Sequence, residues 1–170
     1  AVMLNSARNS LEYILRSHDV SKVYLPKYIC DVMLEPVKKL NLNYEFYGLN
    51  KELRLANAME LEENEFILYV NYFGIMDEYC DQLVEEYGDR LIVDASQAFY
   101  YESPGTHTIY SPRKFLGVSD GGMLYSDRVL GDNIETDVSW ERASHLLKRI
   151  DVGAEEGYSD FVSNDRSLIN

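Results

Sequence analysis

The segment Phe-Ile-Leu-Tyr-Val at residues 66–70, followed after a helical stretch by Leu-Ile-Val-Asp at residues 91–94, decides the fold. A continuous apolar run of this kind is typical of a strand buried on both faces, as in a parallel sheet. Between the runs, six apolar residues recur at helical spacing before Gly88 as a stop signal: Met76, Tyr79, Cys80, Leu83, Val84 and Tyr87. Strand, helix and strand in this order predict a βαβ unit and therefore an α/β protein.

Further elements are predicted on both sides of this unit. Toward the N-terminus, Leu11, Ile14, Leu15 and His18 recur at helical spacing after an N-cap at Asn5 or Ser6, so the chain begins almost directly with a helix. The other predicted elements are strands at 22–25, 43–47, 107–110 and 123–125, and helices at 31–40, 140–150 and 158–169. We expect only a short strand or turn and an acidic loop between residues 48 and 64.

The composition is that of one globular domain with a sizeable core. The chain has 170 residues, of which 46% are hydrophobic and 26% charged. Twenty-nine acidic residues against sixteen basic ones give a formal charge of -13, which disfavours nucleic acid and anionic membranes as partners. Only two cysteines occur, Cys30 and Cys80, and we expect both to be buried thiols in a cytoplasmic protein. No stretch resembles a targeting signal or a membrane span.

Asp94 is the first candidate for chemistry. It ends a buried strand, and ligands of an open parallel sheet bind at the carboxyl ends of the strands. A carboxylate there can pair with a base, bind a metal or hold a protonated ring nitrogen, and it can equally cap the following turn. Gln97, three residues later, adds an amide that could meet a phenolic oxygen.

Lys114 is the second candidate. It lies in Ser-Pro-Arg-Lys-Phe-Leu-Gly-Val-Ser-Asp-Gly-Gly, residues 111–122, twenty residues after Asp94, and we expect a hairpin between them to bring both to one site. A lysine with a lowered pKa can form a Schiff base with a carbonyl, which makes Lys114 a candidate anchor for an aldehyde cofactor. The alternative is a surface lysine in a glycine-rich loop.

The start of the first helix is the third candidate. Unpaired backbone N–H groups and the positive end of the helix dipole make Ser6, Ala7, Arg8 and Asn9 a possible cradle for a phosphate. Ser111 could add its hydroxyl. Any helix start has this property, so the interpretation depends on the other two candidates.

Together these segments resemble the DegT/DnrJ/EryC1/StrS family of fold-type-I aminotransferases, which use pyridoxal phosphate and act on nucleotide-linked keto-sugars. The resemblance covers most of the chain from Ser6 to about Tyr125. Its matching pieces are the helix start at 6–10, Leu-Pro-Lys-Tyr-Ile-Cys at 25–30, Asn-Tyr-Phe-Gly at 71–74, Asp-Ala-Ser-Gln-Ala at 94–98 and the lysine segment at 111–122. It implies a three-layer α/β/α fold with a mostly parallel sheet.

The resemblance also implies a role for each candidate. Asp94 would pair with the pyridinium nitrogen of pyridoxal 5'-phosphate, and Lys114 would bind the cofactor and then act as the general base. Gln97 would lie near the ring oxygen and Tyr28 would stack on the ring. The phosphate would lie near Ser6, Ala7, Arg8 and Ser111. The implied reaction moves an amino group from an amino acid, by analogy glutamate, to a keto-sugar nucleotide in lipopolysaccharide, other polysaccharide or antibiotic sugar synthesis.

The family's size implies that this chain is a fragment of a homodimeric enzyme. Residues 1–150 would form the pyridoxal-phosphate-binding large domain without its opening segment, and residues 151–170 would begin the helix leading to a C-terminal small domain. We expect such a fragment to bind the cofactor weakly and to lack turnover.

Two other interpretations remain open. The chain could be a non-catalytic, aminotransferase-like scaffold, although a scaffold has no physical need for both Lys114 and Asp94. The sugar dehydratase branch of the family replaces the lysine with histidine, which Lys114 disfavours. The three histidines are far apart in the sequence, so no metal site is predicted; His18 is interpreted as the edge of a helix and His107 as a loop or strand residue.

Overall fold

The computed structural model describes residues 1–105, 107–128, 130 and 134–168. A seven-stranded sheet with the order β1-β7-β6-β5-β4-β2-β3 forms its centre. The strands are β1 (Val2–Leu4), β2 (Lys22–Pro26), β3 (Asn43–Tyr47), β4 (Glu65–Val70), β5 (Leu91–Asp94), β6 (His107–Tyr110) and β7 (Gly122–Tyr125). Strands β2 to β6 pair in parallel, and β7 is antiparallel to both of its neighbours, β6 and β1.

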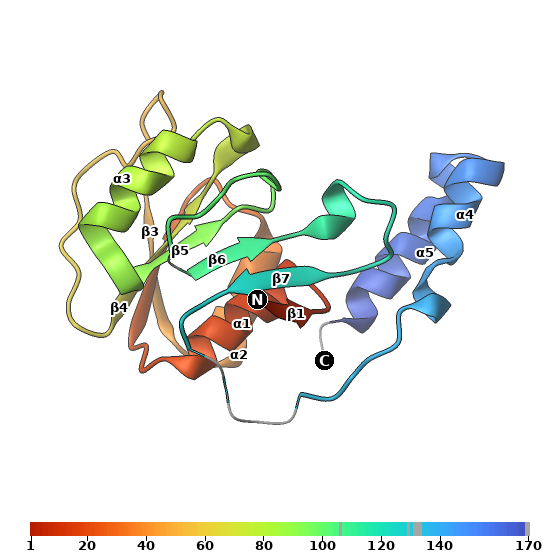
Figure 1. Cartoon of the computed structure of the whole chain (residues 1–170), viewed down its shortest axis with the longest axis horizontal. Coiled ribbons are helices and arrows are strands. Elements are labelled where there is room, and N and C mark those ends of the chain that lie inside the picture. The colour runs from red at the N-terminus through yellow and green to blue at the C-terminus, as the bar shows by residue number, and fades with distance from the viewer. Residues whose placement is uncertain (106, 129, 131–133, 169–170) are drawn as a thin grey trace.

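Helices cover both faces of the sheet, as Figure 1 shows. The helix α3 (Asp77–Tyr87) lies on one face, while α1 (Ala7–Ser17) and α2 (Leu34–Lys39) pack together on the other. A hairpin of α4 (Ser144–Asp151) and α5 (Ala154–Ser167) extends beside the sheet. Short 3-10 helices are η1 (Asp31–Met33), η2 (Tyr72–Gly74), η3 (Gly88–Arg90), η4 (Pro112–Lys114) and η5 (Trp140–Arg142). The arrangement confirms the predicted three-layer α/β/α fold.

The core forms around β4 and β5, the strands that the apolar runs predict. Every side chain from Phe66 to Val70 is at most 5% exposed, because α3 covers one face of the sheet and α1 and α2 cover the other. Leu11 and Ile14 of α1 are fully buried against the sheet. Of the two predicted caps, Asn5 and Ser6, it is Ser6 that caps α1 by accepting a hydrogen bond from the backbone N–H of Asn9, and such a cap contributes about 1 kcal/mol.

Three features differ from the sequence predictions. The first described element is β1, which pairs with β7 alone among the described strands, and no helix starts before Ala7. Strands β5 and β6 are parallel, so the segment between Asp94 and Lys114 is a crossover and the predicted hairpin is wrong. Cys30 is exposed, whereas Cys80 is buried as expected and its burial raises the pKa of its thiol.

The predicted C-terminal helices are present as the α4–α5 hairpin, although Ile169 lies outside the described residues. Among the helices that the structure describes, none has both the length and the apolar composition needed to cross a membrane.

Candidate active site

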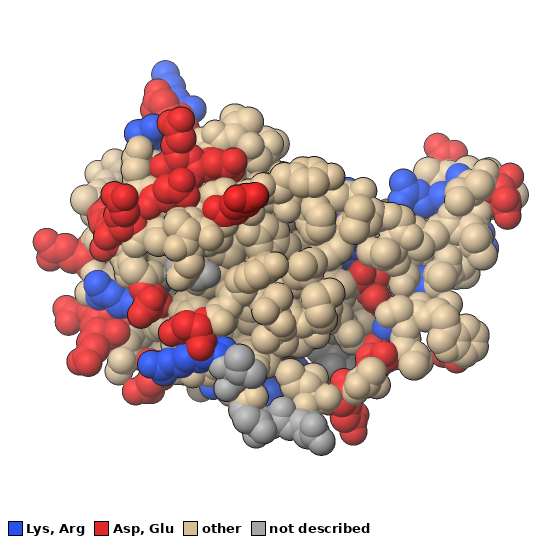
Figure 2. Space-filling view, viewed as in Figure 1, with Lys and Arg blue, Asp and Glu red and all other residues tan. Residues whose placement is uncertain are grey.

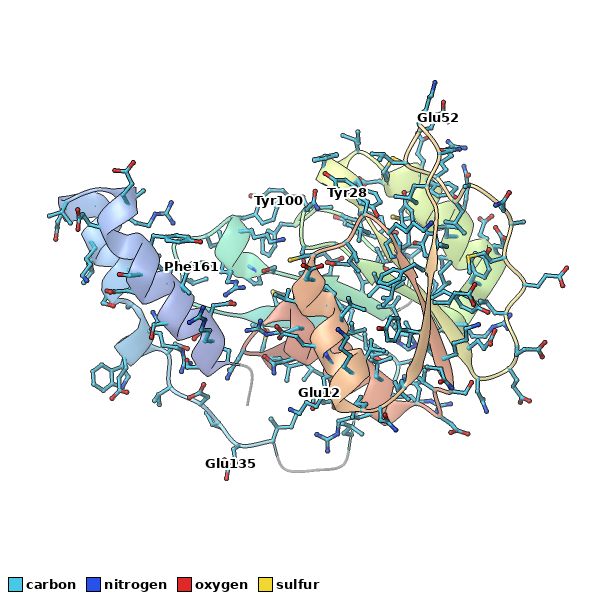
Figure 3. The ribbon with its side chains drawn as sticks, turned by 180° about the vertical axis from the view of Figure 1, so that it is seen from behind. Glu12, Tyr28, Glu52, Tyr100, Glu135 and Phe161 are labelled. Atoms are coloured by element: carbon cyan, nitrogen blue, oxygen red, sulfur yellow. The ribbon has the colours of Figure 1, made fainter. Side chains whose placement is uncertain are left out.

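The carboxyl ends of the parallel strands bring most of the sequence candidates to one edge of the sheet. Tyr28 follows β2, Tyr72 follows β4, Asp94 ends β5 and Ser111 follows β6. Strand β1 runs in the same direction as β6, because both are antiparallel to β7. The N-terminus of α1, which follows β1, therefore opens at this edge too. Figure 3 labels Tyr28 here, and Tyr100 on the loop after β5.

Asp94 is held rigidly between the neighbouring strands. Its side chain is 6% exposed, and its carbonyl accepts a hydrogen bond of 2.9 Å from the backbone N–H of Asn71 after β4. The backbone N–H of Ala95 donates to the carbonyl of Ile109 in β6 at 2.8 Å. The Asp94 Oδ1 atom accepts from the backbone N–H of Ser96 at 2.9 Å, so the carboxylate caps the following turn while remaining at the strand end.

Tyr72 lies near Asp94, and Tyr28 stacks on Tyr72. The rings of Tyr28 and Tyr72 are stacked, with centroids 5.5 Å apart and planes 9° from parallel, and the Tyr72 hydroxyl donates to the Tyr28 carbonyl at 2.8 Å. Burial, and then the negative charge of Asp94, raise the pKa of Tyr72 above its ordinary value. Tyr28 remains 61% exposed. It thus has one ring face covered by Tyr72 and an accessible surface on which a flat ligand could stack.

Gln97 fixes the turn after β4 against the turn after β5. Its Oε1 atom accepts a hydrogen bond of 3.0 Å from the backbone N–H of Phe73, which has a φ of 56°. A side chain on Gly74 would come within 3.2 Å of the Gln97 carbonyl, and Gly74 itself has a φ of 68°. Because the amide oxygen of Gln97 is engaged, its NH₂ group is the part that could donate to a ligand oxygen.

The start of α1 packs closely against the start of β7. Ser6 is 2% exposed, and Asn5 just before it accepts a hydrogen bond of 2.7 Å from the backbone N–H of Gly121. A Cβ atom on Gly122 would overlap the backbone carbonyl of Ser6. With Asn9 capped by Ser6, the backbone N–H groups of Ala7 and Arg8 are the first-turn donors that helix geometry leaves without an intrahelical partner.

The Arg8 side chain joins a charge cluster with α5. It is 6% exposed, its NH1 atom lies 3.2 Å from Glu35 Oε2, and its NH2 group donates to the Asp165 carbonyl at 2.6 Å. Arg113, next to Lys114, forms an ion pair of 2.7 Å with Asp165 Oδ1. Asp165 therefore connects the start of α1 with the lysine segment, and the Arg8 guanidinium is directed at carboxylates. Its backbone N–H remains the group that could meet a phosphate.

We expect Asp165→Ala to loosen the α4–α5 hairpin and to lower the free energy of unfolding by about 1–3 kcal/mol, because two arginines lose their shared carboxylate. Urea unfolding would measure the loss, and limited proteolysis would show faster cleavage within the hairpin. Asp151→Ala, at an exposed acid ending α4, is the matched control and should change little. Equal unfolding midpoints and equal cleavage rates for both variants would contradict this role of Asp165.

Lys114 ends η4 and is exposed. Its backbone N–H donates to the carbonyl of the buried Ser111 at 3.1 Å. Lys114 lines a cavity of about 790 Å³ between the glycine-rich segment and the α4–α5 hairpin, together with Arg113, Phe115, Leu116, Gly117, Val118, Ser119, His145, Leu146, Arg149, Ile150 and Phe161. Figure 3 shows Phe161 on this hairpin. Asp94 and Tyr28 do not line the cavity.

The sequence candidates thus form two groups. Asp94 and Tyr28 lie near Tyr72, and Gln97 accepts a hydrogen bond from the next residue, Phe73. Arg8 and Arg113 are connected through Asp165. Both groups lie at the carboxyl edge.

Ser96 is a residue to which the sequence analysis gave no role. It is 4% exposed, and its Oγ atom has no hydrogen-bond partner among the described residues. It lies between Asp94 and Gln97, so its hydroxyl is a spare donor at the strand end. The signal available in the sequence was a serine two residues after a buried strand, within a segment that the family resemblance already included.

Solved structures with a similar fold include a sugar aminotransferase and two other proteins. The sugar aminotransferase CalS13 from Micromonospora echinospora is 17% identical, with a TM-score of 0.56 over 75% of this chain and 42% of its own. A putative PLP-dependent aminotransferase from Bacillus cereus is 14% identical, with a TM-score of 0.53 over 98% of this chain and 53% of its own. L-threonine-O-3-phosphate decarboxylase from Porphyromonas gingivalis is 14% identical, with a TM-score of 0.57 over 74% of this chain and 44% of its own.

These similarities confirm the predicted fold: the chain has an α/β fold similar to the large domain of fold-type-I pyridoxal-phosphate-dependent aminotransferases. It corresponds to less than half the length of CalS13 and about half that of the Bacillus cereus protein. No protein-family model and no curated protein sequence matches the chain.

Proposed function

We propose that the protein is a pyridoxal-phosphate-dependent aminotransferase that transfers an amino group from an amino acid, glutamate by analogy, to a keto-sugar nucleotide. The observation that carries this proposal is the convergence of Asp94, Gln97 and Tyr28 with the start of α1 at one edge of the sheet. The chain shares its fold with a sugar aminotransferase, and this similarity supports the proposal.

The residues at this edge fit pyridoxal 5'-phosphate in their chemistry. The buried Asp94 carboxylate would keep the ring nitrogen protonated, and Tyr28 offers an exposed ring for stacking. The Gln97 amide would donate to the ring oxygen. Two buried polar atoms without hydrogen-bond partners, Ser96 Oγ and Arg8 Nε, show that donors remain unused among the described residues of both groups.

The phosphate would be held by the start of α1. The backbone N–H groups of Ala7 and Arg8 point out of the first turn, and Ser6 and Ser111 are buried hydroxyls at the same edge. Arg113 and Lys114 add positive charge locally to a chain whose formal charge is -13. When bound, the cofactor would supply a conjugated ring that withdraws electrons from the substrate carbon.

The chain's own residues would then carry out the proton transfers. The Lys114 amine would bind the cofactor aldehyde covalently, and after the amino donor displaces it, the same amine would move a proton at the substrate carbon. The Asp94 carboxylate would keep the ring nitrogen protonated throughout. Apolar side chains, including Phe115 and Phe161, line the cavity that Lys114 also lines.

One observation favours the second candidate, a non-catalytic scaffold with this fold. Lys114 is exposed and lines a cavity that Asp94 does not line. A scaffold needs no approach between the two, whereas catalysis needs Lys114 to reach the ring held by Asp94.

Absorbance spectroscopy separates the two candidates. An aminotransferase should develop a saturable visible band on addition of pyridoxal phosphate, and borohydride should remove the band and leave a reduced adduct on Lys114. A scaffold should give only the spectrum of free cofactor. Screening of amino donors and then of a panel of keto-sugar nucleotides would identify the substrates. The identity of the sugar would test a role in the synthesis of lipopolysaccharide or another polysaccharide.

We also propose that the parent protein is a cytoplasmic homodimer. Figure 2 shows the surface over β6 and β7 almost free of charged side chains. Met3 is 66% exposed, Tyr100 84% and Tyr125 48%. Tyr100 and Tyr125 also line a hollow of about 460 Å³. An apolar surface of this kind supports a protein partner, and the family resemblance makes a second copy of the chain our choice.

Met3→Asp should weaken this self-association by about tenfold or more, because it places a charge on the apolar surface, at the strand next to β7. Sedimentation velocity over a concentration series would measure the effect. Ile150→Asp is the matched control, since Ile150 is 81% exposed but lies on α4. A monomeric wild type, or equal association of the two variants, would rule out this surface as the dimer interface.

A further inference from the structure

We propose that His18, His107 and Asp127 form a binding site for a divalent transition-metal ion, with Zn²⁺ as the best fit. His18 is the C-cap of α1, His107 begins β6, and Asp127 follows the end of β7. One ligand atom from each lies within 4.8 Å of the other two. This cluster lies at the amino edge of β6, opposite the candidate active site, and brings together histidines that are far apart in the sequence.

The distances within the cluster suit a shared ion better than direct hydrogen bonds. Asp127 Oδ1 lies 3.8 Å from His18 Nε2 and 3.7 Å from His107 Nδ1, and both distances are too long for hydrogen bonds. A tetrahedral zinc ion with bonds of about 2.0–2.1 Å separates its ligand atoms by about 3.3 Å. The two distances to Asp127 exceed this separation by only about half an ångström, and the two imidazole nitrogens lie at most 4.8 Å apart.

Backbone carbonyls orient both imidazoles for metal binding. His18 Nδ1 lies 3.0 Å from the Ile14 carbonyl, and His107 Nε2 lies 3.0 Å from the Asp89 carbonyl. A carbonyl only accepts hydrogen bonds, so each of these nitrogens carries the proton. The lone pairs then belong to His18 Nε2 and His107 Nδ1, the two atoms nearest Asp127. Metal-binding histidines typically donate their other N–H in this way.

The His18 lone pair has no hydrogen-bond partner among the described residues. Its side chain is 5% exposed, and Nε2 is a buried polar atom without a hydrogen bond. His107 Nδ1 lies 3.0 Å from Ser126 Oγ, so ion binding would replace that hydrogen bond. Burial, and then the neighbouring His18, lower the pKa of His107. The neutral imidazole is the form that binds metals.

The ligand set selects the kind of ion. Two imidazole nitrogens and one carboxylate oxygen suit Zn²⁺ better than Ca²⁺ or Mg²⁺, which prefer oxygen ligands, and a water molecule would complete the tetrahedron. Asp127 is 56% exposed, so the ion would enter from its side. The bound ion would join the end of α1 to β6 and β7, and its effect would be on stability.

The test uses the 170-residue chain with Cys30→Ser, because an exposed thiol also binds zinc. After treatment with a chelator, calorimetric titration should show one Zn²⁺ per chain. A hundredfold excess over Kd should raise Tm by about 5–10 °C. Co²⁺ should give the visible absorption of a tetrahedral nitrogen–oxygen site.

Asp127→Asn should weaken Zn²⁺ binding at least about tenfold. Because Asp127 is largely exposed, this variant and the wild type should be equally stable when both are free of metal. Asp19→Asn removes an exposed acid beside His18 in the chain and should bind Zn²⁺ normally. His18→Gln should behave like Asp127→Asn. Absence of stoichiometric binding by the wild type, or equal affinity of all the variants, would overturn the proposal.

Discussion

Lys114→Ala should abolish covalent attachment of pyridoxal phosphate, which is the largest functional effect that we expect from one substitution. The proposed bond joins the cofactor aldehyde to a primary amine. Lys114 is the only lysine in η4, the short helix that follows β6. In the wild type, borohydride reduction followed by peptide mass spectrometry should place the adduct on Lys114. In the variant, the saturable visible band and this adduct should both be absent.

Lys27→Ala is the matched control for this experiment. Lys27 is exposed just after β2, at the same edge of the sheet, and its backbone N–H donates to the Tyr47 carbonyl at 2.9 Å, a bond that the substitution retains. This variant should keep both the band and the adduct on Lys114. A wild type without a saturable band, or a Lys114→Ala variant with the same band, would eliminate the assignment of Lys114 and favour the scaffold.

Gly122→Ala should lower the free energy of unfolding by about 3 kcal/mol or more, which is the largest stability effect that we expect. The added Cβ would overlap the Ser6 carbonyl and would lie 2.8 Å from Ser10 Oγ. The overlapping atoms belong to backbone, so neither β7 nor the start of α1 can yield by a side-chain rotation. Thermal unfolding should show a Tm about 10 °C lower, given about 2–4 °C per kcal/mol in a chain of this size.

Gly117→Ala provides the comparison, since a Cβ there would meet no atom within 4 Å. It should change stability by at most about 0.5 kcal/mol. Because Gly122 presses on the first turn of α1, Gly122→Ala should also weaken binding at the proposed phosphate cradle. Equal stability of the two variants would mean that α1 and β7 are packed less closely than the structure shows.

The fold was predictable because its central signals are local. The apolar runs of β4 and β5 contain five and three consecutive residues that pack on both sheet faces, and α3 has a clear helical stripe between them. Asp94 and Gln97 follow from the same reasoning, since strand ends are recognisable without tertiary information. The cap at Ser6 was likewise readable from the residue type and its position before a helical pattern.

The features that were missed depend on contacts between distant residues. Strand β1 has only three residues and exists because Val2–Leu4 pairs with β7. The parallel arrangement of β5 and β6 is set by the whole sheet. The meeting of His18 with His107, whose rings lie 4.5 Å apart, links residues from opposite halves of the chain. The hydrogen bond from Arg8 to the Asp165 carbonyl also joins residues from opposite halves of the chain.

The outer strand β3 has a consequence for association between chains. Asn43, Tyr44, Glu45 and Phe46 are exposed, and no described strand pairs with β3 on the side away from β2, so this edge offers backbone groups to another strand. Lys22 Nζ on β2 lies 2.8 Å from Glu45 Oε2 on β3 and 3.9 Å from Glu65 Oε1 on β4, and thus bridges the carboxylates of the two strands that flank β2. A second β3 strand docking here would add its own Glu45 to a cluster in which two carboxylates, Glu45 and Glu65, already share the single ammonium of Lys22. The repulsion would oppose edge-to-edge growth of the sheet into fibrous aggregates.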